Sequence, residues 1–406
     1  MKILIVGGGG REHALAWRLK QSPAVQGIIA SPGNPGISSI ATCIPAPAEI
    51  SGYADLAEHY GVELTVVGPE APLVAGIVDR FHARGLHIIG PTAAAAQLEG
   101  SKCFAKQFFT RAGIPTARYG AHIKDFSFPV VIKADGLAAG KGVVIAQDGR
   151  EAEQAMQRLG PNVVIEEFLE GEEVSFIGLS DGNTLVPFAP TQDHKRIFDG
   201  DRGPNTGGMG AYSDTRILTS QQGGEVMERI MLPALYQMRK EGTPFTGFLY
   251  AGLMMTADGP KVLEFNVRLG DPETQALMYS FRGDLADLLI GAVRAAPSSW
   301  GAQAAAAPRP AVCVVLAAAG YPEQPRSGDP ISGIEQAEAV GAKVFQAGTR
   351  REHKTLVTNG GRVLGVTADG ETLPEAIAQV YGAVEKIRFE GMHYRRDIAV
   401  GGLKRW

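Results

Sequence analysis

The chain has 406 residues, with 39 Lys and Arg against 43 Asp and Glu, which gives a formal net charge of −4. Hydrophobic residues make up 45% and charged residues 20%, the composition of an ordinary globular protein with more than one domain. No basic excess favours nucleic acid or anionic lipid as a partner, and no apolar run is long enough to span a bilayer. The N-terminus has no signal-peptide pattern, so we expect a cytoplasmic protein.

The first hundred residues alternate short apolar runs with helical patterns. Lys2–Val6 is a strand-like run that stops at four glycines, and a helix is expected directly after it, at Arg11–Gln21. Further strands are expected at 25–30, 64–67 and 87–89, with helices at 53–60 and 73–83. This alternation predicts a doubly wound parallel sheet, an α/β unit, over residues 1–100.

The second expected unit covers residues 101–295. Its predicted helices are 102–112, 151–159, 219–241, 272–280 and 285–295, and its predicted strands are 130–133, 143–146, 163–168, 174–179, 246–255 and 261–266. Antiparallel strands with one helix predict a small α+β lid at about residues 118–187. Residues 199–211 hold five glycines in thirteen and are expected to form a long functional loop.

The C-terminal part is set off by an Ala-, Pro- and Ser-rich stretch, 296–310, that we expect to be a linker. An α+β unit is predicted over 311–406. Its strands are expected near 311–319, 342–347, 353–358 and 362–368, with a helix at 373–388.

The four glycines at 7–10 lie between a strand and a helix. Backbone N–H groups and the helix dipole at such a turn form an anion site that suits a ligand phosphate. A tight turn that merely needs glycine is the alternative. An NAD(P)-dependent oxidoreductase is a weaker hypothesis, because Glu12 stands where G-x-G-x-x-G needs glycine and no acid follows the second strand.

A second glycine-rich turn, 136–142, joins two predicted strands; it contains Lys141 and follows Lys133. The spacing does not match a Walker A loop, since no Ser or Thr follows Lys141. Such a hairpin can fold over a triphosphate, with backbone amides and both lysines neutralising the phosphate charge. A plain hairpin with surface lysines is the alternative, although Lys133 ends an apolar strand, where an idle ammonium is costly.

Two more segments carry polar residues at informative places. Residues 166–173 hold five acids in eight, which is either a solvated loop or a strand end that pairs with an adenine edge, followed by a carboxylate for the ribose. Glu264, Asn266 and Arg268 alternate with apolar residues and share one face of a strand. Two oxygen ligands there suit Mg²⁺, and the arginine suits a carboxylate; a solvated strand face is the alternative.

Together these pieces resemble the ATP-grasp ligases, and within them the phosphoribosylamine–glycine ligase family. The resemblance runs nearly end to end and rests on these segments: GGGGREHALA (7–16), LEGSKCFAK (98–106), IKADGLAAGKGVV (132–144), IEEFLEGEEVSF (165–176), QDHKRIFDGDRGPNTGGMGAY (192–212), LEFNVRLGDPETQ (263–275), LVTNGGRVLGVTA (356–368) and GMHYRRDIA (391–399). It implies an ATP-grasp core with a small lid, between the N-terminal sheet and a C-terminal α+β domain. Two connections, after residue 159 and before residue 310, look shorter than the family's and are interpreted as trimmed surface loops.

The resemblance also implies a role for each matching residue. ATP would be bound by Lys102, Lys133, Lys141, Glu166, Glu167, Phe168, Leu169, Glu173, Lys195, Arg196 and Asn205. Mg²⁺ or Mn²⁺ would be bound by Glu264 and Asn266. Phosphoribosylamine and glycine would be bound by Gly9, Gly10, Arg11, Glu12, Asn34, Pro35, Glu70, Arg268 and Asp271, and Arg268 and Lys133 would act in catalysis.

The implied reaction joins glycine to 5-phosphoribosylamine at the expense of ATP, through glycyl phosphate, in purine biosynthesis. We expect a monomer whose partners are these small molecules. The alternatives are another ATP-grasp carboxylate–amine ligase, an NAD(P)-binding oxidoreductase, and a non-catalytic nucleotide-binding regulator.

Overall fold

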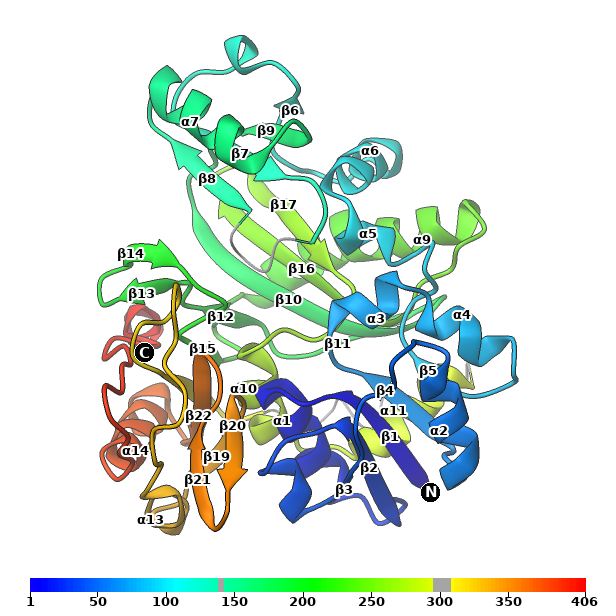
Figure 1. Cartoon of the computed structure of the whole chain (residues 1–406). Helices are drawn as coiled ribbons and strands as arrows, with labels where there is room; N and C mark the ends of the chain where they lie inside the picture. The colour runs from blue at the N-terminus through cyan, green and yellow to red at the C-terminus, as the bar shows by residue number, and fades with distance from the viewer. Residues whose placement is uncertain (138–141, 295–307) are drawn as a thin grey trace.

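The computed structural model describes residues 1–137, 142–294 and 308–406. Its strands form a five-stranded parallel sheet, a nine-stranded antiparallel sheet, a four-stranded antiparallel sheet and two separate hairpins (Figure 1). This confirms the predicted combination of an N-terminal parallel sheet with α+β parts after it. Lys141 and most of the expected linker lie outside the described residues. No helix in the described ranges is both long and apolar enough to cross a membrane.

The N-terminal sheet has the strand order β3-β2-β1-β4-β5, with every pair parallel. The strands are β1 (Lys2–Gly7), β2 (Gly27–Pro32), β3 (Thr42–Cys43), β4 (Leu64–Val67) and β5 (Ile88–Ile89), and the helices are α1 (Gly10–Leu19), α2 (Gly52–Tyr60), α3 (Glu70–Val74) and α4 (Ile77–His82). The chain moves outward from β1 to β3 and then returns to β4 on the other side of β1. Ligands of such sheets bind where the order reverses, so the turns after β1 and β4 mark the candidate site.

The nine-stranded sheet runs in the order β17-β16-β10-β12-β15-β18-β22-β19, and β11 pairs with β10. Its strands are β10 (Glu172–Asp181), β11 (Leu185–Pro187), β12 (Thr191–Asp193), β15 (Gly210–Ser213), β16 (Thr246–Thr256), β17 (Gly259–Asn266), β18 (Ala311–Ala317), β19 (Lys343–Gln346) and β22 (Arg362–Asp369). β15 pairs with β18 over four residues. One sheet is therefore continuous from the central to the C-terminal part of the chain.

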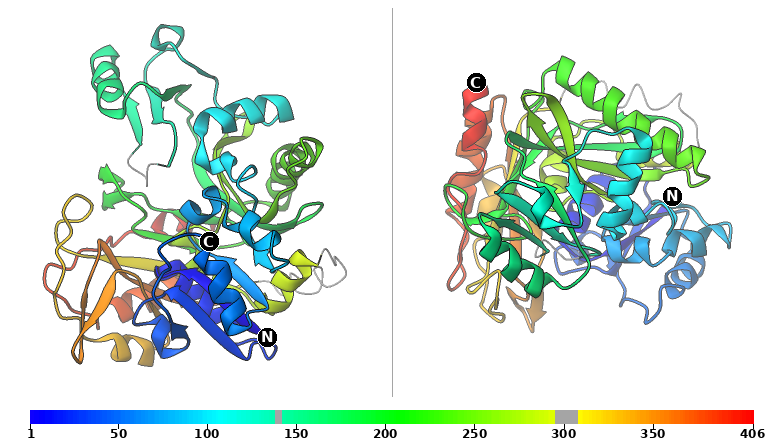
Figure 2. Two further views of the ribbon diagram at one scale, coloured as in Figure 1. Left: turned by 45° about the vertical axis from the view of Figure 1, so that its right-hand side comes forward. Right: turned by 90° about the horizontal axis from the view of Figure 1, so that it is seen from above.

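The four-stranded sheet projects from the rest of the molecule (Figure 2). It contains β6 (Tyr119–Gly120), β7 (Val130–Ala134), β8 (Val143–Ala146) and β9 (Val163–Glu167), and α7 (Gly149–Leu159) packs on it. The hairpins are β13 (Arg196–Phe198) with β14 (Arg202–Asn205), and β20 (Thr349–Glu352) with β21 (Thr355–Thr358).

The remaining helices cover the sheets. They are α5 (Gln97–Gly100), α6 (Lys102–Ala112), α8 (Ser220–Val226), α9 (Leu232–Lys240), α10 (Glu273–Ser280), α11 (Leu285–Val293), α13 (Ile334–Ala339) and α14 (Leu373–Val384). Helix α6 begins where Ser101 Oγ accepts the Phe104 N–H at 3.1 Å, and it ends at Gly113 in the left-handed conformation. Phe109 of α6 packs edge-to-face on Phe265 of β17, which fixes the helix over the large sheet.

Three expected elements differ in the structure. The single helix expected at 73–83 is wrong, because Gly76 adopts a φ of +85° and divides it into α3 and α4. The helix expected at 219–241 is interrupted by a π-helical segment, Met227–Met231, between α8 and α9. The segment expected to be one long loop, 199–211, instead contains β14 and the first residues of β15.

Candidate active site

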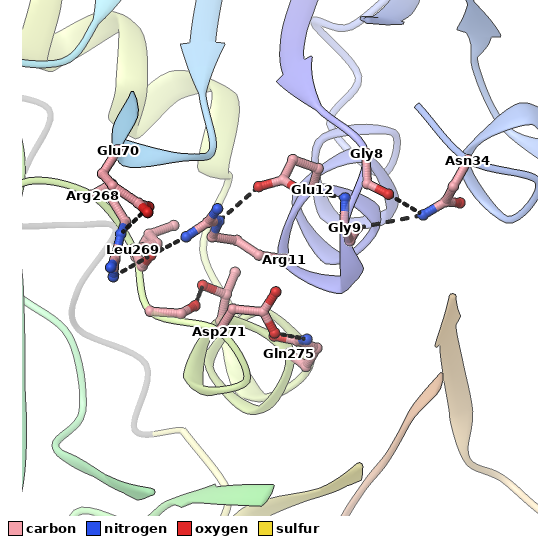
Figure 3. Close-up of polar contacts among 12 residues, drawn as sticks. Gly8, Gly9, Arg11, Glu12, Asn34, Glu70, Arg268, Leu269, Asp271 and Gln275 are labelled. Carbon is pink, nitrogen blue, oxygen red and sulfur yellow. Dashed lines mark hydrogen bonds and ion pairs between the residues drawn. The ribbon is translucent and has the colours of Figure 1, made fainter. Parts of the chain in front are cut away.

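The turn after β1 packs directly against the turn after β2. A Cβ on Gly8 would lie 2.4 Å from the Gly33 carbonyl oxygen, so only glycine allows this approach. Asn34 holds the same turn, since its Nδ2 donates to the Gly8 carbonyl at 2.9 Å and lies 3.5 Å from the Gly9 carbonyl oxygen (Figure 3). It also donates to the Gln346 carbonyl of β19 at 2.7 Å. The predicted substrate residues Gly9 and Asn34 therefore come together, and β19 supports them.

Glu12 lies in the first turn of α1, and its carboxylate reaches back to the glycine turn that precedes this helix. Its carboxylate accepts the Gly9 N–H at 2.5 Å and the Arg11 Nε–H at 2.7 Å. A Cβ on Gly68, after β4, would lie 1.9 Å from Glu12 Oε1, so Glu12 fills the space between the turns after β1 and β4. The carboxylate thus serves the geometry of the turn, and it leaves the Arg11 guanidinium directed toward Leu269.

Arg268 is the centre of a polar cluster beside this turn. Its guanidinium donates to Glu99 Oε1 at 2.7 Å, to Glu70 Oε2 at 3.3 Å and to Asn266 Oδ1 at 3.2 Å. These carboxylates raise the pKa of Arg268, although burial opposes the shift. The Glu70 and Arg268 side chains, predicted from distant segments, therefore lie in direct contact.

The Leu269 carbonyl joins the two clusters. It accepts from Arg11 Nη1 at 3.0 Å and from Arg268 Nη1 at 3.4 Å (Figure 3). Two residues further on, Asp271 accepts from Gln275 Nε2 at 2.9 Å and lies 3.5 Å from Arg362 Nη1. Burial would raise the pKa of Asp271, but the positive charges of Arg362 and Arg11 outweigh it and lower that pKa.

Glu264 lies on β17 among three lysines. Burial alone would raise its pKa, but the positive charges of Lys195, Lys133 and Lys102 hold the pKa below its usual range. Glu264 and Asn266 share one face of the strand, so an ionised carboxylate and an amide oxygen point the same way. No group of three or more His, Cys, Asp and Glu in the described ranges could hold a metal. The pair nonetheless fits Mg²⁺, which commonly takes one or two protein carboxylates together with substrate phosphates.

Lys133 and Glu166 form a buried ion pair in the four-stranded sheet. Lys133 Nζ lies 3.1 Å from Glu166 Oε1 and donates to the Leu263 carbonyl of β17 at 2.9 Å. The other carboxylate oxygen lies 3.0 Å from Lys106 Nζ, and burial lowers the pKa of Lys106 to about 8. A single carboxylate thus holds two ammonium groups where the small sheet meets α6 and β17.

Lys102 begins α6 and reaches the glycine-rich turn after β7. Its Nζ donates to the Gly136 carbonyl at 2.8 Å, and burial lowers its pKa. Asp135, in the same turn, accepts from Ser101 Oγ at 3.0 Å and from the Cys103 N–H at 3.2 Å. The first turn of α6 and the turn after β7 are therefore tied together next to Glu264.

Lys195 follows β12 and pairs with two acids. Its Nζ contacts Glu173 and lies 3.7 Å from Asp193, and together with Glu264 these negative charges raise the pKa of Lys195 well above its usual value despite burial. Burial raises the pKa of Asp193 to about 7; the charge of Lys195 opposes this shift, and the charges of Glu273 and Glu173 add to it. Beside them, Tyr250 Oη donates to Glu273 Oε1 at 2.6 Å.

The other predicted ATP residues line the same region with less contact. Glu167 accepts the Arg118 N–H at 2.8 Å, Leu169 is buried and Phe168 is exposed. Arg196 donates to the Gly203 carbonyl at 2.6 Å across its own hairpin, and Asn205 is its partner in the β13–β14 register. Gly10 is the first residue of α1, and Pro35 lies in the turn after β2. The binding roles of all these residues stay predictions.

Sequence reasoning missed two buried charges at the site. Lys106 follows Lys102 by four residues, so both lie on one side of α6. This spacing could have placed Lys106 at the site together with Lys102, and in the structure Lys106 lies over the ring of the buried Phe109. Glu99 accepts the Val267 N–H at 2.8 Å as well as the Arg268 guanidinium. No local pattern marks Glu99, because its partners lie about 170 residues away in the chain.

Comparison with known proteins identifies the class of enzyme to which the chain belongs. Residues 100–274 match the family described as phosphoribosylglycinamide synthetase, ATP-grasp (A) domain, so the chain is an ATP-grasp ligase. Residues 1–99 match the N domain and residues 311–401 the C domain of the same synthetase. An N5-carboxyaminoimidazole ribonucleotide synthetase from Thermotoga maritima is similar in fold alone, at 19% identity and a TM-score of 0.67 over 96% of this chain and 99% of that one.

The chain belongs to the phosphoribosylamine–glycine ligase family. It is 49% identical to phosphoribosylamine–glycine ligase of Allochromatium vinosum, over 100% of this chain and 99% of that protein. It is 48% identical to the Pseudomonas aeruginosa ligase over the same shares. The crystal structure of the Thermotoga maritima ligase is similar with a TM-score of 0.85 at 36% identity, covering 98% of this chain and 100% of that one.

Proposed function

We propose that the protein joins glycine to 5-phosphoribosylamine and converts ATP to ADP and phosphate, forming glycinamide ribonucleotide. One observation carries this proposal: Arg268 and Arg11 both donate to the Leu269 carbonyl. Arg268 lies beside Glu264 and its three lysines, and Arg11 lies beside the glycine turn. An ATP-activated acid and a phosphorylated amine bound at these two places would be neighbours. Proximity of this kind is a large part of catalysis in a ligase.

We assign the nucleotide to the charges around Glu264. Lys102, Lys133 and Lys195 would neutralise the triphosphate, and Glu173 would bind the ribose, for which it must exchange its contact with Lys195. Glu166–Leu169 would present backbone groups to the adenine. Glu264 and Asn266 would hold Mg²⁺, which offsets charge on phosphate oxygens when bound.

The glycine carboxylate is assigned to Arg268. The carboxylate attacks the γ-phosphorus of ATP, the bond to the β-phosphate oxygen breaks, and glycyl phosphate and ADP result. The guanidinium is held by Glu99 and Glu70, so it is oriented before substrate binds and need not reorganise during the transfer. Lys133 would stabilise charge on the transferred group.

Phosphoribosylamine is assigned to the glycine turn. Gly10, at the N-terminus of α1, would bind its phosphate, and Gly9 would join it by exchanging the contact of its N–H with Glu12. Arg11, Asn34, Pro35, Glu70 and Asp271 would lie around the ribose and amine. The amine then attacks the acyl carbon of glycyl phosphate, the C–O bond to phosphate breaks, and one amine proton is lost. The cytoplasmic location and the monomeric state expected from the sequence stay predictions.

The deciding experiment measures ADP release with ATP, Mg²⁺ and glycine, with and without freshly prepared phosphoribosylamine. Turnover that needs both substrates supports the proposal. Activity with another acid and amine, and silence with this pair, would keep the ATP-grasp chemistry and reject the substrates.

A further inference from the structure

Arg395 is among the largest fully buried side chains in the protein, and no substrate role is assigned to it. It belongs to the GMHYRRDIA segment near the C-terminus, 1% of its side chain is exposed, and it extends toward the β13–β14 hairpin. Its guanidinium donates to Asp201 Oδ1 at 2.7 Å, to both carboxylate oxygens of Asp397 at 2.7 Å, and to the Arg196 carbonyl at 3.1 Å. One arginine thus joins β13 and the turn of the hairpin to the C-terminal part.

Neighbours of Arg395 hold the rest of the hairpin turn. The Arg396 N–H donates to Asp199 Oδ1 at 2.8 Å, and Asp397 Oδ2 accepts the Gly200 N–H at 2.8 Å. His393 Nε2 lies 2.8 Å from the Ile197 carbonyl oxygen. The turn therefore takes its shape from residues that are almost 200 positions further along the chain.

The turn needs this support because its backbone is unfavourable. Asp201 has a φ of +53°, in the left-handed region that non-glycine residues rarely adopt. Such a conformation persists where surrounding contacts hold it. The ion pair with Arg395 is a contact of this kind, since 71% of the Asp201 side chain is otherwise exposed.

The residues directly after the β13–β14 hairpin are also held by the C-terminal part of the chain. Arg362 Nη1 donates to the Gly207 carbonyl at 2.6 Å, and the Gly207 N–H donates to Tyr321 Oη at 3.0 Å. Thr206 lies between the hairpin and Gly207, and its N–H and its hydroxyl both donate to the Lys195 carbonyl at 2.8 Å. The backbone of Lys195 is thereby fixed to the held segment.

We propose that Arg395, through Asp201 and Asp397, is a positioning residue that shapes the β13–β14 hairpin for nucleotide binding. The inference rests on the proposed function, in which Lys195 neutralises the triphosphate, and on the ATP contacts expected for Arg196 and Asn205. Arg395 itself touches no substrate. It fixes the hairpin on which Arg196 and Asn205 lie, and Lys195 directly precedes this hairpin.

The first variant changes Asp201, the exposed partner in the ion pair with Arg395. Asp201→Asn removes the charge and keeps a residue type that tolerates the left-handed conformation. We expect the KM for ATP to rise about fivefold to tenfold, with the KM for glycine and the melting temperature unchanged. Amide hydrogen exchange of residues 196–205 should become faster in the protein without ATP.

Glu352→Gln is the matched control, because Glu352 pairs with Arg350 in the separate hairpin β20–β21. It should leave the KM for ATP and the exchange of 196–205 at wild-type values. Arg395→Lys is the second variant, since lysine keeps the charge but cannot bridge both acids and the Arg196 carbonyl. It should raise the KM for ATP at least as much as Asp201→Asn.

Wild-type exchange and an unchanged KM for ATP in Asp201→Asn would overturn the proposal. A fall in melting temperature without a selective change in the KM for ATP would overturn it too, since that result marks a purely structural ion pair. If the wild-type protein shows no turnover with the proposed substrates, the proposed function fails. The exchange rates of 196–205 would still decide whether Arg395 shapes the hairpin.

Discussion

Glu264 is the residue on which the metal assignment depends. Glu264→Gln keeps the shape of the side chain and removes the charge that faces three lysines. We expect turnover to fall by at least about tenfold to a hundredfold, the range for residues that support a metal ligand. The melting temperature should fall as well, because the ionised carboxylate offsets the charges of three lysines in the folded protein. Glu225→Gln, on an exposed ion pair with Arg229, is the control. Full activity of Glu264→Gln at saturating Mg²⁺ would refute the metal role.

Variants of Lys133 and Lys106 can distinguish an effect on ATP binding from an effect on stability, because both lysines are buried and both pair with Glu166. Lys133→Met should raise the ATP concentration needed for half-maximal rate by one to two orders of magnitude, since a charge-assisted contact contributes roughly 1.5–3 kcal/mol. Lys106→Met should leave that concentration nearly unchanged. Both variants should lower the melting temperature, since each weakens a buried ion pair. Equal ATP dependence of the two would contradict a phosphate role for Lys133.

Single residues also show how far the sequence predicts the site. Glu264 and Asn266 were predictable as neighbours because alternation on β17 places them on one face. Arg268 follows the end of this strand and contacts Asn266 Oδ1. Glu99 was not, because its role comes from Arg268 and Val267, which only the fold brings near it. Glu12 was assigned to substrate, yet its carboxylate is bound to the Gly9 N–H and the Arg11 side chain, so its substrate role stays a prediction.

At the scale of elements, the turn after β1 has a strict steric requirement. In Gly8→Ala the new Cβ would meet the Gly33 carbonyl, a backbone atom that cannot move without moving the turn after β2. We expect the KM for phosphoribosylamine to rise at least about tenfold and the KM for ATP to change little. Gly27→Ala, in the same sheet with its nearest atom 3.9 Å away, is the control. Identical kinetics of the two variants would rule out the turn as the phosphate site.

Elements with strong periodicity were predicted well, and those decided by tertiary contacts were not. The parallel sheet and α6 follow from apolar patterns and glycine stops. The β13–β14 hairpin does not, because Pro204 and three nearby glycines favour a loop, and the hairpin exists through its contacts with Arg395 and Arg396. The break at Gly76 depends on one left-handed residue, which periodicity does not reveal.

At the scale of the whole molecule, His13 links the N-terminal sheet to β19. Its Nδ1 accepts the Gln346 N–H at 2.8 Å, and burial, with a smaller effect of Lys343, lowers its pKa to about 3. The unfolded chain takes up this proton below about pH 6.5, and the folded protein does not until about pH 3. The contribution of His13 to stability is therefore complete above pH 6.5 and is lost as the pH falls toward 3.

His13→Gln tests this linkage. Between pH 7.5 and 5.5 the unfolding free energy of the wild type should fall by roughly 1 kcal/mol more than that of the variant. Urea denaturation at the two pH values measures the difference. Parallel losses in both proteins would mean that His13 does not remain neutral in the folded state.

The pairing of β15 with β18 has a consequence for synthesis on the ribosome. β15 ends at residue 213 and its partner begins at residue 311, so one edge of the growing sheet has no neighbour while the intervening residues are made. At a translation rate of about 5–20 residues per second, this edge remains unpaired for roughly 5 to 20 s. An unpaired strand edge is a template for association with other chains. During translation of residues 214–310, this edge is therefore open to association with other chains.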